Sequence, residues 1–119
     1  MELTDRNYEK LLKESEIPAF VEFYSPTCGP CQALLRLIED RLADYAGEQG
    51  VRLLTCDVSR NPKLAEAFKI RSVPFTIGVL PDGRLKYPEL GLKEEAYYFD
   101  VIDRLAGKKR SLFAKLFGK

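Results

Sequence analysis

One kind of segment limits the fold of this chain more than any other feature. Residues 18–24, PAFVEFY, carry apolar side chains at nearly every position rather than at alternate ones. Such a run predicts a strand buried on both faces, which is typical of parallel sheets covered by helices on each side. Residues 51–58, VRLLTCDV, and residues 73–80, VPFTIGVL, also predict buried strands. The sequence therefore favours a central sheet between two helical layers.

Helical patterns alternate with these strands along the chain. Helices are predicted at residues 6–15, 32–50, 62–69 and 93–107. The turn PDG at residues 81–83 joins the third strand to a fourth at residues 84–90, which makes a hairpin. The order helix, strand, helix, strand, helix, strand, strand, helix indicates an α/β fold with a mixed sheet.

Two of these helices begin next to typical capping residues. Thr4 or Asp5 is expected to cap the first helix, and Asn61 is expected to cap the third, with Pro62 in its first turn. Both predictions are local, because a side-chain oxygen just before a helix can accept a hydrogen bond from the unpaired N–H groups of the first turn.

The composition narrows the class of protein. The 119 residues are enough for one compact domain, and the net charge of +1 gives no global sign of nucleic-acid binding. The charged start of the chain does not look like a secretory signal, and no stretch approaches the roughly 18 apolar residues of a membrane span. We therefore expect a cytoplasmic protein.

The chain contains no histidine and three cysteines. The lack of histidine excludes Ser-His-Asp and Cys-His nucleophiles and histidine-ligated zinc. Three cysteines are also too few for the disulfide framework of a small secreted domain. Any chemistry must then use thiols, carboxylates, lysines or tyrosines.

Residues 28–31, CGPC, place two thiols where the first strand meets the second helix. Unpaired N–H groups at a helix start stabilise a thiolate and so lower the thiol pKa. The spacing brings both sulfurs to one side of the first turn, with Cys28 expected as the exposed attacker and Cys31 as the shielded resolving thiol. Two alternatives are inert buried thiols and half of a metal site, although Cys56 supplies no second pair.

These segments together resemble the thioredoxin family. The resemblance covers residues 1–107 and is carried by VEFYSPTCGPCQ, by DVSRNPKLAEAFKIRSVPFTIGVLPDG and by LGLKEE. It implies the thioredoxin fold, with a central mixed four- to five-stranded sheet and helices on both faces. It also implies a monomeric thiol–disulfide oxidoreductase that acts on protein disulfides, receives electrons from a thioredoxin-reductase-type donor and carries no cofactor of its own.

The resemblance also implies roles for single residues. Pro74 matches a proline that follows a cis peptide bond beside the active site and turns the backbone of Val73 toward the dithiol. Asp57 and Pro62 match framework positions. The residues implied to meet the substrate are Thr27, Gly29, Pro30, Val73, Pro74 and Gly91.

Glu22 is the most informative residue outside the CGPC motif. A carboxylate inside an apolar strand is costly unless it is paired or protonated. The resemblance implies that Glu22 accepts the proton of Cys31, whereas on an edge strand it would simply be solvated. Family members often place a lysine beside this carboxylate, and the matching position is taken to be Leu53. Without that cation, we predict a raised pKa for Glu22.

Other departures from the family pattern concern specificity and the core. Thr27 and Tyr24 stand where tryptophan is common, so the surface that meets the substrate is expected to be reshaped. Cys56 lies in an apolar strand and is predicted to be a small buried core thiol rather than a redox switch.

The C-terminal tail, residues 108–119, is a separate basic segment. It contains five Lys or Arg residues and no acid, whereas residues 1–107 hold 14 basic and 18 acidic residues, a net charge of −4. Leu112, Phe113, Leu116 and Phe117 recur at helical spacing. Three outcomes are open: the tail packs on its own domain, docks on a protein partner, or makes weak contact with an anionic membrane.

The sequence favours one function over two others. Gly-Pro between the cysteines is the pairing of reducing members of the family, which indicates a protein disulfide reductase. A disulfide isomerase or oxidase of the same fold is an alternative, but oxidising members tend to carry a histidine there. A binding module that acts through its groove or its tail is the third hypothesis.

Overall fold

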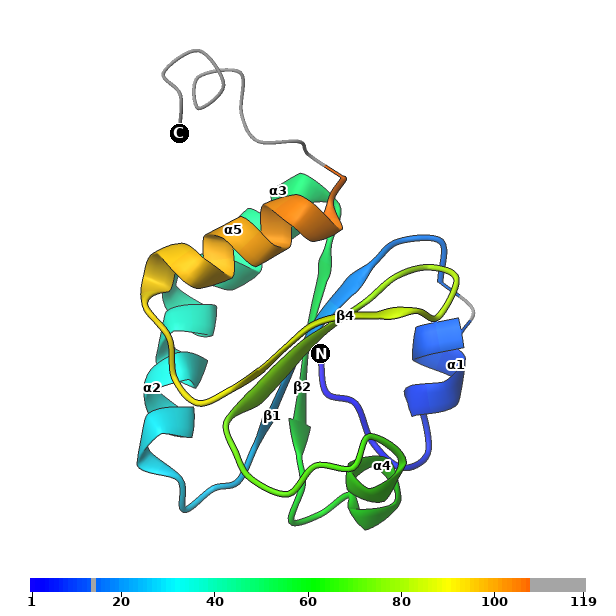
Figure 1. Ribbon diagram of the computed structural model, residues 1–119, viewed down its shortest axis with the longest axis vertical. Coiled ribbons are helices and arrows are strands. Elements are labelled where there is room, and N and C mark those ends of the chain that lie inside the picture. The colour runs from blue at the N-terminus through cyan, green and yellow to red at the C-terminus, as the bar shows by residue number, and fades with distance from the viewer. Residues whose placement is uncertain (14, 108–119) are drawn as a thin grey trace.

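A central four-stranded sheet organises the structure, a computed structural model that describes residues 1–13 and 15–107. The strand order is β2-β1-β3-β4, as Figure 1 shows. The strands are β1 (Ala19–Tyr24), β2 (Arg52–Asp57), β3 (Phe75–Val79) and β4 (Leu85–Leu90). β1 pairs parallel with β2 and antiparallel with β3, and β3 pairs antiparallel with β4. The predicted mixed sheet is confirmed, with Glu2 adding only an isolated bridge to Thr55.

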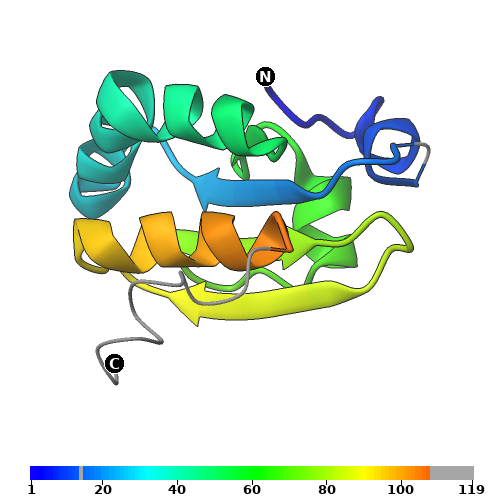
Figure 2. The ribbon, with the colours of Figure 1, turned by 90° about the horizontal axis from the view of Figure 1, so that it is seen from above.

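Helices cover both faces of this sheet (Figure 1). One face carries α1 (Tyr8–Lys13) and α4 (Pro62–Ala67). The other carries α2 (Gly29–Leu37), η1 (Ile38–Leu42), α3 (Ala43–Gln49) and α5 (Glu95–Leu105). The single helix predicted over residues 32–50 is therefore interrupted by one π-helical stretch, η1, and ends at Gly50 in the left-handed conformation. Seen from above, α5 runs beside the α2–α3 segment (Figure 2).

Two apolar clusters hold these layers together. The cluster beneath α1 and α4 includes Ala19, Val21 and Phe23 of β1, all fully buried. The cluster beneath α2, α3 and α5 includes Phe20 of β1. Since successive strand side chains point to opposite faces, β1 contributes to both clusters, as its continuous apolar run predicts.

Helix α5 approaches the sheet closely at one glycine. A Cβ atom built on Gly78 of β3 would lie 2.6 Å from Cδ2 of Leu105. Gly78 thus leaves room for the Leu105 side chain in the last turn of α5, and a larger residue at position 78 would have to displace that side chain.

The caps of α1 and α4 differ in part from the local predictions. Thr4 does accept a hydrogen bond from the N–H of Asn7, at 3.2 Å. Asp5 instead caps the start of α4, where one carboxylate oxygen accepts the N–H of Leu64 at 2.8 Å. Asn61 makes no capping bond to α4, and its side chain accepts the N–H of Asp5 at 2.9 Å and donates to the Asp57 carbonyl at 2.9 Å. Asn61 is thus the N-cap residue with Pro62 in the first turn, as predicted, but the capping bond of a side chain comes from the distant Asp5 carboxylate instead.

The tail at residues 108–119 lies outside the described residues, so the division into a domain and a tail stays a prediction. Within the part of the chain that is described, no helix combines the length and the apolar character needed to cross a bilayer.

Candidate active site

Cys28 and Cys31 sit at the start of α2, as the sequence predicts. Cys28 is the N-cap residue, with an extended backbone, and it forms a disulfide with Cys31 across a Cα–Cα distance of 5.2 Å. The Cys31 N–H donates to the Cys28 Sγ atom at 3.1 Å. Cys28 is half-buried and Cys31 is completely buried. In this arrangement, the Cys31 N–H and the start of α2 both favour the thiolate form of Cys28, the less buried of the two cysteines.

A second loop faces the disulfide. The peptide bond between Val73 and Pro74 is cis, which confirms the conformation that the resemblance implies. The carbonyl oxygen of Val73 lies 3.8 Å from Cys28 Sγ. The N–H of Gly91 donates to the Pro74 carbonyl at 2.8 Å, and Gly91 has φ of 93°, where only glycine is unstrained. The loop with the cis bond therefore lies beside Cys28, and Gly91 is bonded to that loop.

The remaining residues implied to meet the substrate lie on the surface around Cys28. Thr27, Gly29 and Pro30 are exposed. The Thr27 hydroxyl lies 3.3 Å from the Ser25 hydroxyl, so a small polar pair occupies the position where the family often has a large ring. The surface next to Cys28 therefore carries small hydroxyl side chains on this side.

Glu22 is fully buried on the central strand β1, with strands on both sides, so the solvated edge-strand alternative is wrong. Its side chain shares the Phe20 face of the sheet, which α2 and α5 cover. Neither carboxyl oxygen has a hydrogen-bond partner among the described residues. Burial raises the pKa of Glu22 from 4.5 to about 8, which confirms the predicted direction.

Two uncharged residues of β2 lie on the same face of the sheet as Glu22. In the register of the sheet Glu22 pairs with Thr55, and Leu53 pairs with Phe20 two residues away. Leu53 lies two residues along β2 on the same face of the sheet as Glu22, so its match to the family's lysine position stays a prediction. The conclusion that no cation stands there holds for Thr55 as well, since its side chain is uncharged.

Thr76 is a residue of this site that sequence reasoning missed. It lies opposite Glu22 on the antiparallel neighbour β3, and it is fully buried. Its hydroxyl, like the carboxyl of Glu22, has no partner among the described residues. The only sequence signal was a polar residue in the apolar run after Pro74, and the pairing with Glu22 required the sheet register.

Two further residues have roles outside the reaction. The Asp57 carboxylate accepts hydrogen bonds from the backbone N–H of Ser59 at 2.9 Å and from its hydroxyl at 2.6 Å, which shapes the turn after β2. Cys56 is fully buried in the cluster beneath α1 and α4, and burial raises its pKa to about 12. Its thiol is thus in the core, on the face of the sheet away from Glu22.

Known proteins share this arrangement. The family model described as Thioredoxin matches residues 1–103. The chain belongs to the thioredoxin family. A thioredoxin of Rickettsia felis is 30% identical over 102 residues, which cover 86% of this chain and 94% of that protein. A chloroplastic M-type thioredoxin of Zea mays is 30% identical over 105 residues, covering 87% of this chain and 60% of the relative.

A solved structure supports the fold separately. Chloroplastic thioredoxin z superposes with a TM-score of 0.73 over 89% of this chain and 93% of its own, at 21% identity. At that identity the likeness concerns the fold alone. Together with the CGPC pair, the family membership makes this protein a thiol–disulfide oxidoreductase of the thioredoxin type, whose substrate class is protein disulfides.

Proposed function

We propose that this thioredoxin-family protein works as a monomeric, cytoplasmic reductant of protein disulfides. The observation that carries the proposal is the asymmetry of the two cysteines. Cys28 is half-buried and receives a backbone N–H, whereas Cys31 is completely buried. This asymmetry supports Cys28 as the sulfur that meets the substrate and Cys31 as the sulfur that acts after the substrate has bound.

In the first step, the Cys28 thiolate attacks one sulfur of a substrate disulfide. The substrate S–S bond breaks as a bond to Cys28 Sγ forms, and the leaving substrate thiolate takes a proton. The N–H of Cys31 stabilises the attacking thiolate before this step. The backbone of Val73, next to the cis bond, offers the substrate chain a strand-like partner beside the sulfur.

In the second step, Cys31 resolves the mixed disulfide. Its thiol must lose a proton before it attacks Cys28 Sγ, and Glu22 is the acceptor that we propose. A base is most effective when its pKa lies near the working pH, and burial brings the pKa of Glu22 to about 8. The Cys28–Cys31 bond then forms, the second substrate sulfur leaves as a thiol, and two electrons have passed to the substrate.

The oxidised protein needs a dithiol donor to start again, and we propose a thioredoxin-reductase-type partner for this. The reducing direction is supported by Gly-Pro between the cysteines and by the absence of histidine from the chain. A reductant of this kind is expected in a reducing compartment, which supports the cytoplasm.

The reduction potential of the Cys28–Cys31 pair tests the direction of transfer. Equilibration against a dithiothreitol or glutathione series should give a value nearer to about −270 mV than to about −120 mV, the values typical of reducing and oxidising proteins of this fold. A value near the oxidising end would replace the proposed reductase by an oxidase and would argue against the cytoplasm.

A further inference from the structure

The acidic charge of the domain is concentrated on one helical layer. Residues 29–49 and 94–105, which comprise α2, η1, α3 and α5 with its N-cap residue, hold eight acidic and three basic residues, a net charge of −5. The rest of residues 1–107 holds ten acidic and eleven basic residues, a net charge of +1. None of the eleven charged residues of the layer is buried. The layer is therefore an anionic surface on an otherwise balanced domain.

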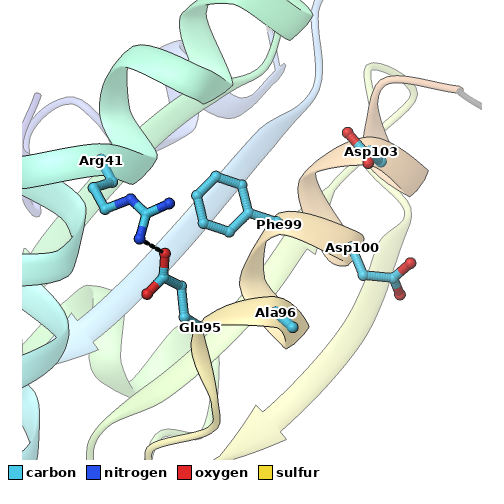
Figure 3. Close-up of a pocket in the computed structure, with 6 residues that line it drawn as sticks. All are labelled: Arg41, Glu95, Ala96, Phe99, Asp100 and Asp103. Atoms are coloured by element: carbon cyan, nitrogen blue, oxygen red, sulfur yellow. Dashed lines mark ion pairs between the residues drawn. The ribbon is translucent and has the colours of Figure 1, made fainter.

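A groove opens in this layer between η1 and α5. It has a volume of about 660 Å³ and is lined by Arg41, Glu95, Ala96, Phe99, Asp100 and Asp103. Figure 3 shows Arg41 and Phe99 reaching toward each other from the two helices. The Arg41 guanidinium lies 5.5 Å from the centroid of the half-buried Phe99 ring. The groove thus combines an aromatic floor, which can also hold another cation, with a carboxylate-rich wall.

The acids of the groove are held only by contacts that another cation can replace. Glu95 pairs with Arg41, Asp100 pairs with Arg104, and Asp103 accepts a hydrogen bond from the Tyr45 hydroxyl. The two ion pairs are exposed at the surface, where such pairs contribute only about 0 to 1 kcal/mol. An incoming lysine or arginine can share these carboxylates with little loss.

The chain leaves this layer directly at the end of the groove. Helix α5 ends at Leu105, and Gly107 has φ of 79°, a left-handed residue that turns the chain away from the helix axis. From Asp103 to Glu95 the groove follows about 12 Å of helix. The following 12 residues, 108–119, span about 18 Å as a helix and more if extended, so they are long enough to follow the groove.

We propose that residues 108–119 dock in this groove, with their cations on the acidic layer and their phenylalanines on the Phe99 floor. The tail carries five basic residues and no acid, which balances the net charge of −5 on the layer. Its apolar residues, among them Phe113 and Phe117, can contact Phe99 and Ala96. No other surface of the described domain has a negative charge of this size beside the point where the tail begins.

Backbone amide NMR of the full-length chain tests this docking. Signals of residues 111–117 are compared at about 20 mM and 300 mM salt, because screening weakens attraction between exposed charges. We expect these signals to move with salt in the wild type, and to lose more than half of that movement in Asp100→Lys. The matched control is Glu66→Lys, the same charge change at an exposed site on α4, which should behave like the wild type.

Other results would overturn the proposal. Salt-independent tail signals, or equal movement in Asp100→Lys and Glu66→Lys, would show that the groove does not hold the tail. Movement that depends on protein concentration would assign the tail to a second copy. If the tail signals respond only to added anionic phospholipid vesicles, with no effect of Asp100→Lys, the occupant is a membrane surface instead.

Discussion

The two faces of β1 are buried to the same degree but differ in chemistry. Val21 and Phe23 point into a purely apolar cluster beneath α1 and α4. Phe20 and Glu22 point toward α2 and α5, and neither the Glu22 carboxyl nor the hydroxyl of Thr76, its pair on β3, has a partner among the described residues. Each such group costs roughly 1 to 3 kcal/mol when left unpaired. The polar pair lies on the face that α2, the helix of the dithiol, covers.

The degree of burial alone therefore does not tell which residues of this sheet only stabilise the fold and which could also affect the exchange reaction. The side chains of the apolar face serve packing. A substitution there should lower the free energy of unfolding equally at every pH and leave the exchange reaction intact. The Glu22 face accepts a destabilising group, to which we assign the proposed proton transfer from Cys31. Substitutions on the two faces should have opposite signs in stability and different effects on turnover.

The largest expected effect lies at the dithiol itself. Cys28→Ser should abolish disulfide reduction, since the attacking sulfur is gone, whereas Cys31→Ser should still attack and should accumulate the mixed disulfide. Reduction of insulin with dithiothreitol as donor measures turnover, and mass spectrometry detects the trapped adduct. Cys56→Ala is the control, and it should keep full turnover because that thiol is buried on the other face. Trapping by Cys28→Ser instead would reverse the two roles.

On the apolar face, Phe23→Ala should lower the free energy of unfolding by about 3 to 5 kcal/mol. Phe23 is fully buried and its ring lies 5.3 Å from that of Phe68 and 6.3 Å from that of Phe75. Urea unfolding at several pH values measures the loss, which should not vary with pH. A loss that changes steeply with pH would mean that this face is coupled to Glu22 and that the two faces are not independent.

On the other face, Glu22→Gln should stabilise the oxidised protein at high pH. The pKa of Glu22 is about 8 in the folded protein against an ordinary value of 4.5, so the folded protein holds the extra proton between these values. Wild-type stability therefore falls as pH rises through this range, and Glu22→Gln escapes the loss. From pH 5 to pH 8.5 we expect the advantage of the variant to grow by about 3 to 4 kcal/mol.

Urea unfolding of the oxidised wild type and of Glu22→Gln at both pH values gives this difference, with Glu66→Gln on exposed α4 as control. The same Glu22→Gln variant should resolve the mixed disulfide more slowly, because the proton acceptor is missing. If the difference in free energy of unfolding between the wild type and Glu22→Gln is the same at pH 5 and pH 8.5, the pKa of Glu22 is not raised in the folded protein.

The smallest effect is expected at Thr76. Thr76→Val removes a buried hydroxyl without a partner, so stability should stay within about 1 kcal/mol of the wild type or rise slightly. The pKa of Glu22 should rise further, because Thr76 is paired with Glu22 in the sheet and its hydroxyl could turn to donate to the ionised carboxylate. Carbon NMR of the Glu22 carboxyl measures the change, and Thr76→Ser should restore the wild-type value. An unchanged pKa in Thr76→Val would make Thr76 a packing residue.

Much of the fold could be predicted because its signals are local. The continuous apolar run of β1 predicts a strand buried on both faces, and helical spacing predicts the helices on either side. The CGPC motif lies where a strand feeds a helix, so the positions of Cys28 and Cys31 follow from order along the chain. The burial of Glu22 follows from its apolar neighbours.

Other features depend on residues that are far apart in sequence. Asp5 caps α4 across 59 residues, and this long-range bond displaced the local prediction for Asn61. Thr55 and Thr76 stand on either side of Glu22, because register is decided by strand pairing. The π-helical stretch η1 interrupts a helix whose spacing gave no sign of a break.

The order of the elements, the dithiol at the start of α2 and the excess of acid over base in residues 1–107 all follow from the amino-acid sequence alone. Folding in three dimensions was needed to place Thr76 opposite Glu22, to turn the Val73 carbonyl toward Cys28 and to gather the acidic residues around one groove. The physical reason is the range of each interaction. Helix and strand preferences act over a few neighbouring residues, whereas pKa shifts, register and charged surfaces arise from groups that meet only when the chain has folded.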